Sequence, residues 1–128
     1  MVRDDGTLAM VDIQDARRGP LGYDLASLVY DAYVDLDEGL ASRLIERYRA
    51  ALPDSPGPAG FEAALTLIAS QRLIKALGTF GYQAAVLGRR RYLEAVPRTL
   101  ARLSRLLPRS PLTDSVAQRL RASGLLAN

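Results

Sequence analysis

The sequence contains no cysteine and no histidine among its 128 residues. Without cysteine, disulfide bonds and thiolate chemistry are excluded. Without histidine, Ser-His-Asp and Cys-His arrangements, histidine-ligated zinc sites and imidazole proton shuttles are excluded as well. A metal site in this chain would need oxygen ligands, which favours magnesium, calcium or manganese. Proton transfer would need Asp, Glu, Lys or Tyr side chains.

Long apolar runs, tryptophan and lysine are also scarce. No stretch approaches the roughly 18 uncharged apolar residues of a membrane span, and the opening residues MVRDDG lack the apolar centre of a signal peptide. We therefore expect a cytoplasmic protein with no membrane partner. Lys75 is the only lysine, so the net charge of +3 comes almost wholly from arginine. Because tryptophan is absent and aromatics make up 6%, a nucleic-acid partner is not expected.

The chain begins with the pattern of a short hairpin. An Asp-Gly pair at positions 5–6 is a turn signal, and an apolar run follows it at 8–11. Residues 2–13 are therefore predicted to form a β-hairpin. A two-stranded hairpin is marginally stable alone, so we expect it to pack on the helices or on something outside these 128 residues.

The rest of the chain shows the 3.6-residue periodicity of amphipathic helices. The third periodic segment is apolar on nearly all sides of its first half, which predicts a buried central helix. Proline and glycine punctuate the connections. The predicted fold class is mainly α, an N-terminal β-hairpin followed by four to five helices. The predicted helices span about residues 23–36, 37–52, 61–82, 92–107 and 113–123.

The first candidate site is Asp12 with Asp15, at the end of the apolar run. A carboxylate at the tip of a strand suits Mg²⁺, which takes one or two protein carboxylates and further ligands from water and substrate phosphates. Asp is also a favoured turn residue, so a polar turn stays open as the other interpretation. Asp24 opens the next helix, where it is predicted to cap the helix or to brace the Asp12 loop.

Two polar groups on the later helices are further candidates. Gln71 and Arg72 interrupt an apolar helix, and they either pack against an internal acid or line a substrate cleft. The arginines after the third helix are interpreted as a solvated face, with nucleic-acid binding as the alternative. These arginines are residues 89–91, Arg98, Arg102, Arg105 and Arg109.

The stretch Val11-Asp-Ile-Gln-Asp-Ala-Arg-Arg-Gly-Pro-Leu-Gly-Tyr-Asp-Leu-Ala-Ser-Leu28 resembles the metal-binding segment of the aminoglycoside phosphotransferase and choline kinase superfamily. It is most similar to the bacterial sugar-kinase branch that includes the N-acetylmuramate and N-acetylglucosamine anomeric kinases. Members of that branch carry Asp-Phe-Gln-Asp-Ala and, after a loop, Tyr-Asp-Leu. Residues 71–80 and 91–98 also resemble later helices of the branch.

The resemblance implies roles for individual residues. Asp12 would hold magnesium against the phosphates of ATP, in a reaction that depends mainly on positioning and charge neutralisation. Asp15 is a second candidate ligand, and Asp24 matches the loop-bracing aspartate. The parent reaction would transfer the γ-phosphate of ATP to a hydroxyl of a sugar or amino sugar. The helices that carry Gln71 and Arg72 would form the wall on the substrate side.

The resemblance also implies parts that these residues do not contain. The family's ATP-binding N-terminal lobe and its His-x-Asp-x-x-x-x-Asn loop, which supplies the catalytic base, have no counterpart here. We therefore expect one domain, most of a kinase-like C-terminal lobe, with the hairpin and metal loop in residues 1–21 and a helical subdomain in 22–128.

This partial lobe is expected to be inactive alone, to contain no catalytic residue, and to have no ATP or magnesium of its own. It should form homo-oligomers through apolar surface that the other lobe would cover. The alternatives are a non-catalytic helical interaction module for an acidic partner or nucleic acid, and a degenerate kinase kept as a scaffold.

Overall fold

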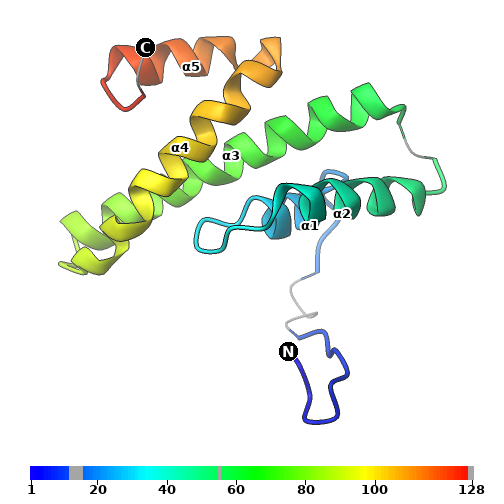
Figure 1. The fold of residues 1–128 in the computed structure, drawn as a ribbon. Helices are drawn as coiled ribbons and strands as arrows, with labels where there is room; N and C mark the ends of the chain where they lie inside the picture. Colours follow the sequence, from blue (N-terminus) through cyan, green and yellow to red (C-terminus); the bar gives the residue numbers. More distant parts are fainter. Residues whose placement is uncertain (12–15, 55, 127–128) are drawn as a thin grey trace.

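The computed structural model describes residues 1–11, 16–54 and 56–126. The mainly α prediction is confirmed, and five α-helices lie in the described ranges (Figure 1). They are α1 (Tyr23–Val29), α2 (Glu38–Ala50), α3 (Pro58–Ala85), α4 (Val96–Leu106) and α5 (Asp114–Ala122). Short 3₁₀ helices join the last elements, namely η2 (Arg90–Ala95), η3 (Leu107–Arg109) and η4 (Pro111–Thr113).

The predicted β-hairpin over residues 2–13 is wrong, because no strand occurs in the described part of the chain. The chain does turn at Gly6, where φ is +79°, but residues 1–11 form a single isolated antiparallel bridge, between Val2 and Leu8, and residues 12 and 13 lie outside the described ranges. These two side chains remain 69% and 82% exposed. A two-stranded ribbon with no packed face gains too little to extend its pairing, and in Figure 1 this segment extends away from the helices.

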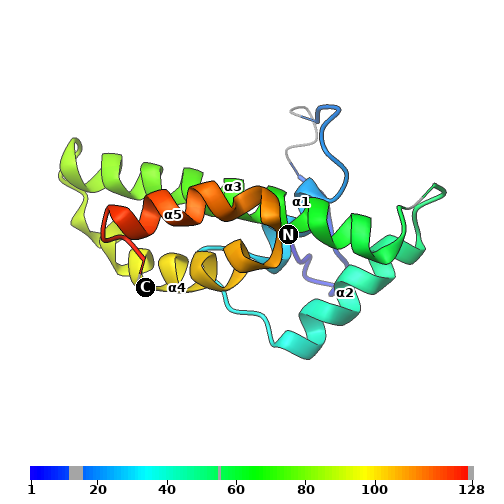
Figure 2. The ribbon, with the colours of Figure 1, turned by 90° about the horizontal axis from the view of Figure 1, so that it is seen from above.

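Helix α3 is the long central element against which the other helices pack. Its buried side chains recur every four residues at Phe61, Leu65, Ala69 and Leu73, which is the spacing of one helical face. Helix α1 packs on this face, and α4 runs back along α3 (Figures 1 and 2). The predicted central helix is therefore confirmed and is longer than predicted.

The core of the molecule lies where α1, α3 and α4 meet. It is a single apolar cluster that also takes in one residue each from η3, α5 and the C-terminal segment. Burial of this size is what stabilises helices of seven to thirteen residues, which are marginal alone. The most buried members from the three helices are Ala26, Ala69, Leu73 and Leu103.

Helix α1 ends earlier than the periodicity predicts, at Val29 rather than near residue 36. The Asp31 carboxylate accepts hydrogen bonds from the backbone N–H groups of Tyr33 and Val34, at 2.7 and 2.9 Å. Such a local side-chain acceptor competes with the helical hydrogen bonds and favours a turn. Residues 30–37 therefore form a loop, here called the α1–α2 loop, instead of about two further helical turns.

The fourth helix also differs from its prediction at its start. Residues 90–95 form η2, and the α-helix begins only at Val96. Pro97 occupies the first turn of α4, where a missing backbone N–H costs nothing, whereas it would interrupt a helix begun at 92. No helix in the described ranges is long and apolar enough to cross a bilayer.

Candidate functional site

The two predicted magnesium ligands, Asp12 and Asp15, lie outside the described residues. Within the described ranges, no group of three or more His, Cys, Asp or Glu side chains is placed to hold a metal ion. The donors that the prediction names are carboxylate oxygens, which suit a hard cation such as Mg²⁺. The magnesium site therefore stays a prediction that rests on Asp12.

Asp24 lies in the first turn of α1 and is exposed. The helix is capped by Gly22, with φ at +85°, and no side chain caps it. A Cβ at Gly22 would lie 3.4 Å from the Leu65 side chain, so glycine suits both the backbone and the close approach to α3. Among the described residues the Asp24 carboxylate makes no hydrogen bond, so its bracing role remains a prediction.

A cleft of about 260 Å³ lies between α1, the α1–α2 loop and the C-terminal half of α3. Its lining includes the buried ring of Phe80, which Tyr33 meets edge-on with ring centroids 5.6 Å apart. Hydroxyl groups and two cations also line the cleft. The polar lining residues are Ser27, Tyr30, Asp31, Tyr33, Arg72, Lys75 and Thr79.

Arg72 and Gln71, predicted together as substrate-wall residues, lie on different sides of α3. Arg72 lines the cleft, and its guanidinium carbon lies 4.5 Å from the ring centroid of Tyr23 on α1. Gln71 instead lines a more apolar groove of about 390 Å³ between α3 and the start of α5. Consecutive helical residues point about 100° apart, which separates the pair.

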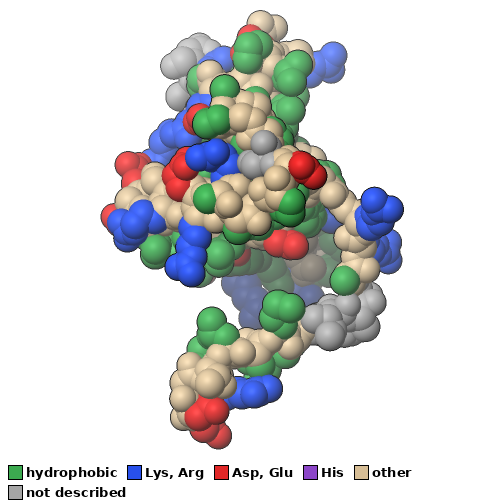
Figure 3. Space-filling model, turned by 90° about the vertical axis from the view of Figure 1, so that its right-hand side faces the viewer, with side chains coloured by type: hydrophobic (Ala, Val, Ile, Leu, Met, Phe, Trp, Pro, Cys, Tyr) green, Lys and Arg blue, Asp and Glu red, His purple; other side chains and the backbone are tan. Residues whose placement is uncertain are grey.

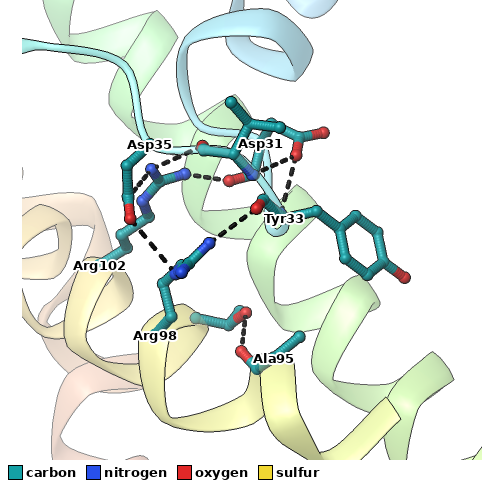
Figure 4. A network of polar contacts seen from close by, with 8 residues as sticks. Asp31, Tyr33, Asp35, Ala95, Arg98 and Arg102 are labelled. Carbon is teal, nitrogen blue, oxygen red and sulfur yellow. Dashed lines mark hydrogen bonds and ion pairs between the residues drawn. The ribbon is translucent and has the colours of Figure 1, made fainter. Parts of the chain in front are cut away.

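One wall of the cleft is held by two arginines of α4, which clamp the α1–α2 loop (Figure 4). Arg102 donates to the backbone carbonyls of Asp31 and Val34, and to the Asp35 carboxylate. Arg98 donates to the Tyr33 carbonyl at 2.7 Å, and its Nε lies 3.3 Å from Asp35 Oδ2. The clamp therefore ties the loop that carries Asp31 and Tyr33 to α4.

The interpretation of these arginines as a solvated face is wrong for Arg102, which is 7% exposed. A buried guanidinium must be paired and hydrogen-bonded, and the loop carbonyls and Asp35 do this. The sequence alone did not signal this, because the spacing of Arg98, Arg102 and Arg105 is that of a polar helical face. The acceptors lie 67 to 71 residues earlier in the chain, so no local pattern could name them.

Two electrostatic features concern residues that line the cleft, namely the Tyr30 phenol and the cations of Arg72 and Lys75. Burial raises the pKa of the Tyr30 phenol above its usual value of 10, with nearby Arg109 opposing the shift and Glu62 adding to it. The phenol is therefore protonated at neutral pH and can donate a hydrogen bond. Arg72 and Lys75 belong to none of the ion pairs found among the described residues.

Comparison with known proteins identifies a related activity. The chain matches three proteins named N-acetylmuramate/N-acetylglucosamine kinase. The one from Pseudomonas aeruginosa is 35% identical over 107 residues, 80% of this chain and 32% of the relative. The chain is similar to sugar kinases. The Neisseria meningitidis relative is 32% identical over 106 residues, and the Pseudomonas putida relative 34% over 107, each again covered over 32% of its length.

These matches confirm the resemblance to bacterial sugar kinases and support a kinase-family origin. The chain spans about a third of the length of the curated relatives it matches. No family model matches the chain, and no solved structure matches it significantly. The wider superfamily therefore remains a prediction from the Asp12 segment.

Proposed function

We propose that this chain forms the helical, sugar-facing part of an ATP-dependent kinase that phosphorylates an N-acetyl amino sugar. The observation that carries the proposal is the match of about 80% of the chain to kinases whose names specify such sugars. The cleft between α1 and α3 supports it, because a compact hollow lined by hydroxyls and an aromatic ring suits a sugar better than an apolar ligand.

In this proposal each candidate residue has a defined part. Asp12, with Asp15 as a second candidate, would hold Mg²⁺, which neutralises charge on the phosphates of ATP. Asp24 would brace the loop between these acids and α1. Arg72 would line the sugar site, whereas Gln71 faces the groove beside α5 and drops out of that wall.

The reaction would join a sugar hydroxyl oxygen to the γ-phosphorus of ATP, with ADP as the leaving group. The hydroxyl proton would pass to a base that lies outside these 128 residues. The contribution of the described residues is positioning, because the Arg98 and Arg102 clamp keeps one wall of the cleft in place. Positioning supplies a large share of the rate in phosphoryl transfer.

The alternative, an interaction module that binds acidic partners through its arginines, would have to use the exposed guanidinium groups of the stripe, such as those of Arg105 and Arg109. Such binding needs free guanidinium groups, and Arg102 is buried against the α1–α2 loop. Arg98 from the same stripe is also engaged with that loop. We put forward the kinase proposal alone, because the names of the matching relatives support it.

The test replaces the matching segment of the Pseudomonas aeruginosa relative with this chain and measures sugar phosphate formed from ATP. We expect the chimera to phosphorylate N-acetylmuramate or N-acetylglucosamine. The relative with the segment deleted is the matched control and should be inactive. A chimera that unfolds cooperatively but phosphorylates neither sugar would overturn the proposal.

The 128 residues by themselves should show no turnover of ATP, since the His-x-Asp-x-x-x-x-Asn loop is not among them. ATP turnover by the isolated chain that vanishes in Asp12→Ala would contradict the partial-lobe assignment.

A further inference from the structure

We propose that the Arg72 and Lys75 end of the cleft binds the carboxylate of an acidic amino sugar and so selects N-acetylmuramate over N-acetylglucosamine. The inference rests on the proposed function and names the substrate feature that the site recognises. The two sugars differ by a lactyl ether, which gives N-acetylmuramate its carboxylate. A cationic side chain in the sugar site would therefore bind N-acetylmuramate in preference to N-acetylglucosamine.

The two cations lie on one face of α3. Arg72 and Lys75 are three residues apart, a spacing that places side chains side by side on a helix, and both line the cleft. Lys75 lies between the two hollows, because it lines both the cleft and the groove near α5. The ion pairs among the described residues use other arginines, so both cations are available to a ligand.

Arg72 is already oriented by its neighbour. Its guanidinium lies over the Tyr23 ring, with 4.5 Å between the guanidinium carbon and the ring centroid. A planar guanidinium held in this way keeps its donor edge for bidentate pairing with a carboxylate. A stacked arginine also loses less side-chain freedom on binding, which favours the bound state.

The acid on the described lining of the cleft does not cancel this charge. Asp31 Oδ1 accepts backbone hydrogen bonds from Tyr33 and Val34, at 2.7 and 2.9 Å. Two cations against this one carboxylate leave the lining with an excess of one positive charge. The cleft therefore attracts an anion of single charge.

The size of the cleft favours a monosaccharide. Its volume of about 260 Å³ lies just below the range of roughly 300–1,000 Å³ that is typical of small-ligand sites. The Tyr33 ring, 58% exposed, offers an aromatic surface for the C–H face of a sugar. The Ser27 and Thr79 hydroxyls donate to the Tyr23 and Lys75 carbonyls, so their oxygens can still accept hydrogen bonds from sugar hydroxyls. Inorganic phosphate shares the anionic chemistry, so the test includes it as a separate ligand.

The test titrates the ¹⁵N-labelled 128-residue chain with N-acetylmuramate, N-acetylglucosamine and inorganic phosphate and follows backbone amide shifts. We expect N-acetylmuramate to bind about tenfold more tightly than N-acetylglucosamine, because a charge-assisted carboxylate contact is added. The largest shifts should come from residues that line the cleft. Arg72→Gln and Lys75→Gln should each reduce the preference, and Arg72→Lys should retain part of it.

Arg91→Gln is the matched control, because Arg91 also lies over a tyrosine, Tyr92 at 5.4 Å, but does not line the cleft. It should keep the preference for N-acetylmuramate. Lys75→Gln leaves the Tyr23 stacking in place, so it tests the charge even if Arg72→Gln disturbs folding.

Equal affinity for the two sugars would overturn the inference, as would a preference that survives in both glutamine variants. Phosphate that binds as tightly as N-acetylmuramate and displaces it would assign the cations to phosphate instead. Binding of neither sugar would also overturn it. The proposed function is judged separately, by phosphorylation in the chimera.

Discussion

The N-terminal segment, residues 1–11, and the α3–α4 pair contain similar apolar side chains but place them very differently. Met10 is 87% exposed, whereas Leu103 is completely buried. Figure 3 shows apolar side chains on the surface of the N-terminal segment, set apart from the helical part. Helical periodicity gathers the apolar residues of α3 and α4 on faces that meet each other, and the N-terminal segment has no comparable partner among the described residues.

This difference separates the apolar side chains that the helices bury against one another from those that stay exposed in the N-terminal segment. Helices α1, α3 and α4 bury one another, so this part should fold as a unit. Under the proposed function, the N-terminal segment would pack against the rest of the kinase. The predictions below test this contrast, beginning with the largest expected effect.

Leu103→Ala should lower the free energy of unfolding by about 3 kcal/mol, because it leaves a cavity in a fully buried site. Leu8→Ala removes the same atoms from a residue that is 82% exposed, and it should change the free energy of unfolding by less than about 0.5 kcal/mol. Urea unfolding followed by circular dichroism measures both. Equal losses would show that the N-terminal segment is packed in solution.

Arg102→Ala should cost about 2–3 kcal/mol of unfolding free energy, since it leaves the Asp31 and Val34 carbonyls without their buried donor. Arg105→Ala, on the exposed side of the same helix, is the control and should have almost no effect. The same urea titration compares them. If both variants lose the same stability, the clamp does not hold the α1–α2 loop.

Asp37→Ala should cost about 1 kcal/mol, because the Asp37 carboxylate caps α2 by accepting from the Leu40 N–H at 3.0 Å. Asp54→Ala removes an exposed acid outside the helices and should be neutral. Thermal unfolding distinguishes them. A neutral Asp37→Ala would mean that packing alone positions the start of α2.

The exposed N-terminal side chains should act on association rather than on stability. Contiguous exposed apolar groups promote self-association, so the chain is predicted to form dimers or larger assemblies that Met10→Ser and Leu8→Ser weaken. Light scattering after size-exclusion chromatography gives the mass, and the unfolding free energy should stay unchanged. A monodisperse monomer of the unsubstituted chain at high concentration would refute the prediction.

Local patterns predicted most of the helical part. The apolar faces of α2, α3 and α5 repeat within a few residues, so their positions follow from the sequence alone. The hairpin at residues 2–13 was wrong because strands need a packing surface that the turn signal does not report. The early end of α1 was missed because the Asp31 turn overrides the apolar spacing that continues to Leu36.

The candidate site was only partly predictable, because contacts between distant parts of the chain decide which side chains form it. The polar break in α3 indicated Arg72, which lines the cleft, but it could not show that Gln71 faces the other side. The Arg102 clamp depends on acceptors about seventy residues away, and the stripe of arginines suggested a solvated face instead. Long-range pairing, not local pattern, decides both.

The most direct test of the kinase proposal is the rate of sugar phosphorylation by the chimera with Asp12→Asn. The rate should fall more than about a hundredfold, because groups that merely support a metal ligand already contribute about 10–100-fold. Asp4→Asn, an exposed acid of the same N-terminal segment, should leave the rate unchanged. Unchanged phosphorylation in Asp12→Asn would contradict the assignment of this carboxylate to magnesium.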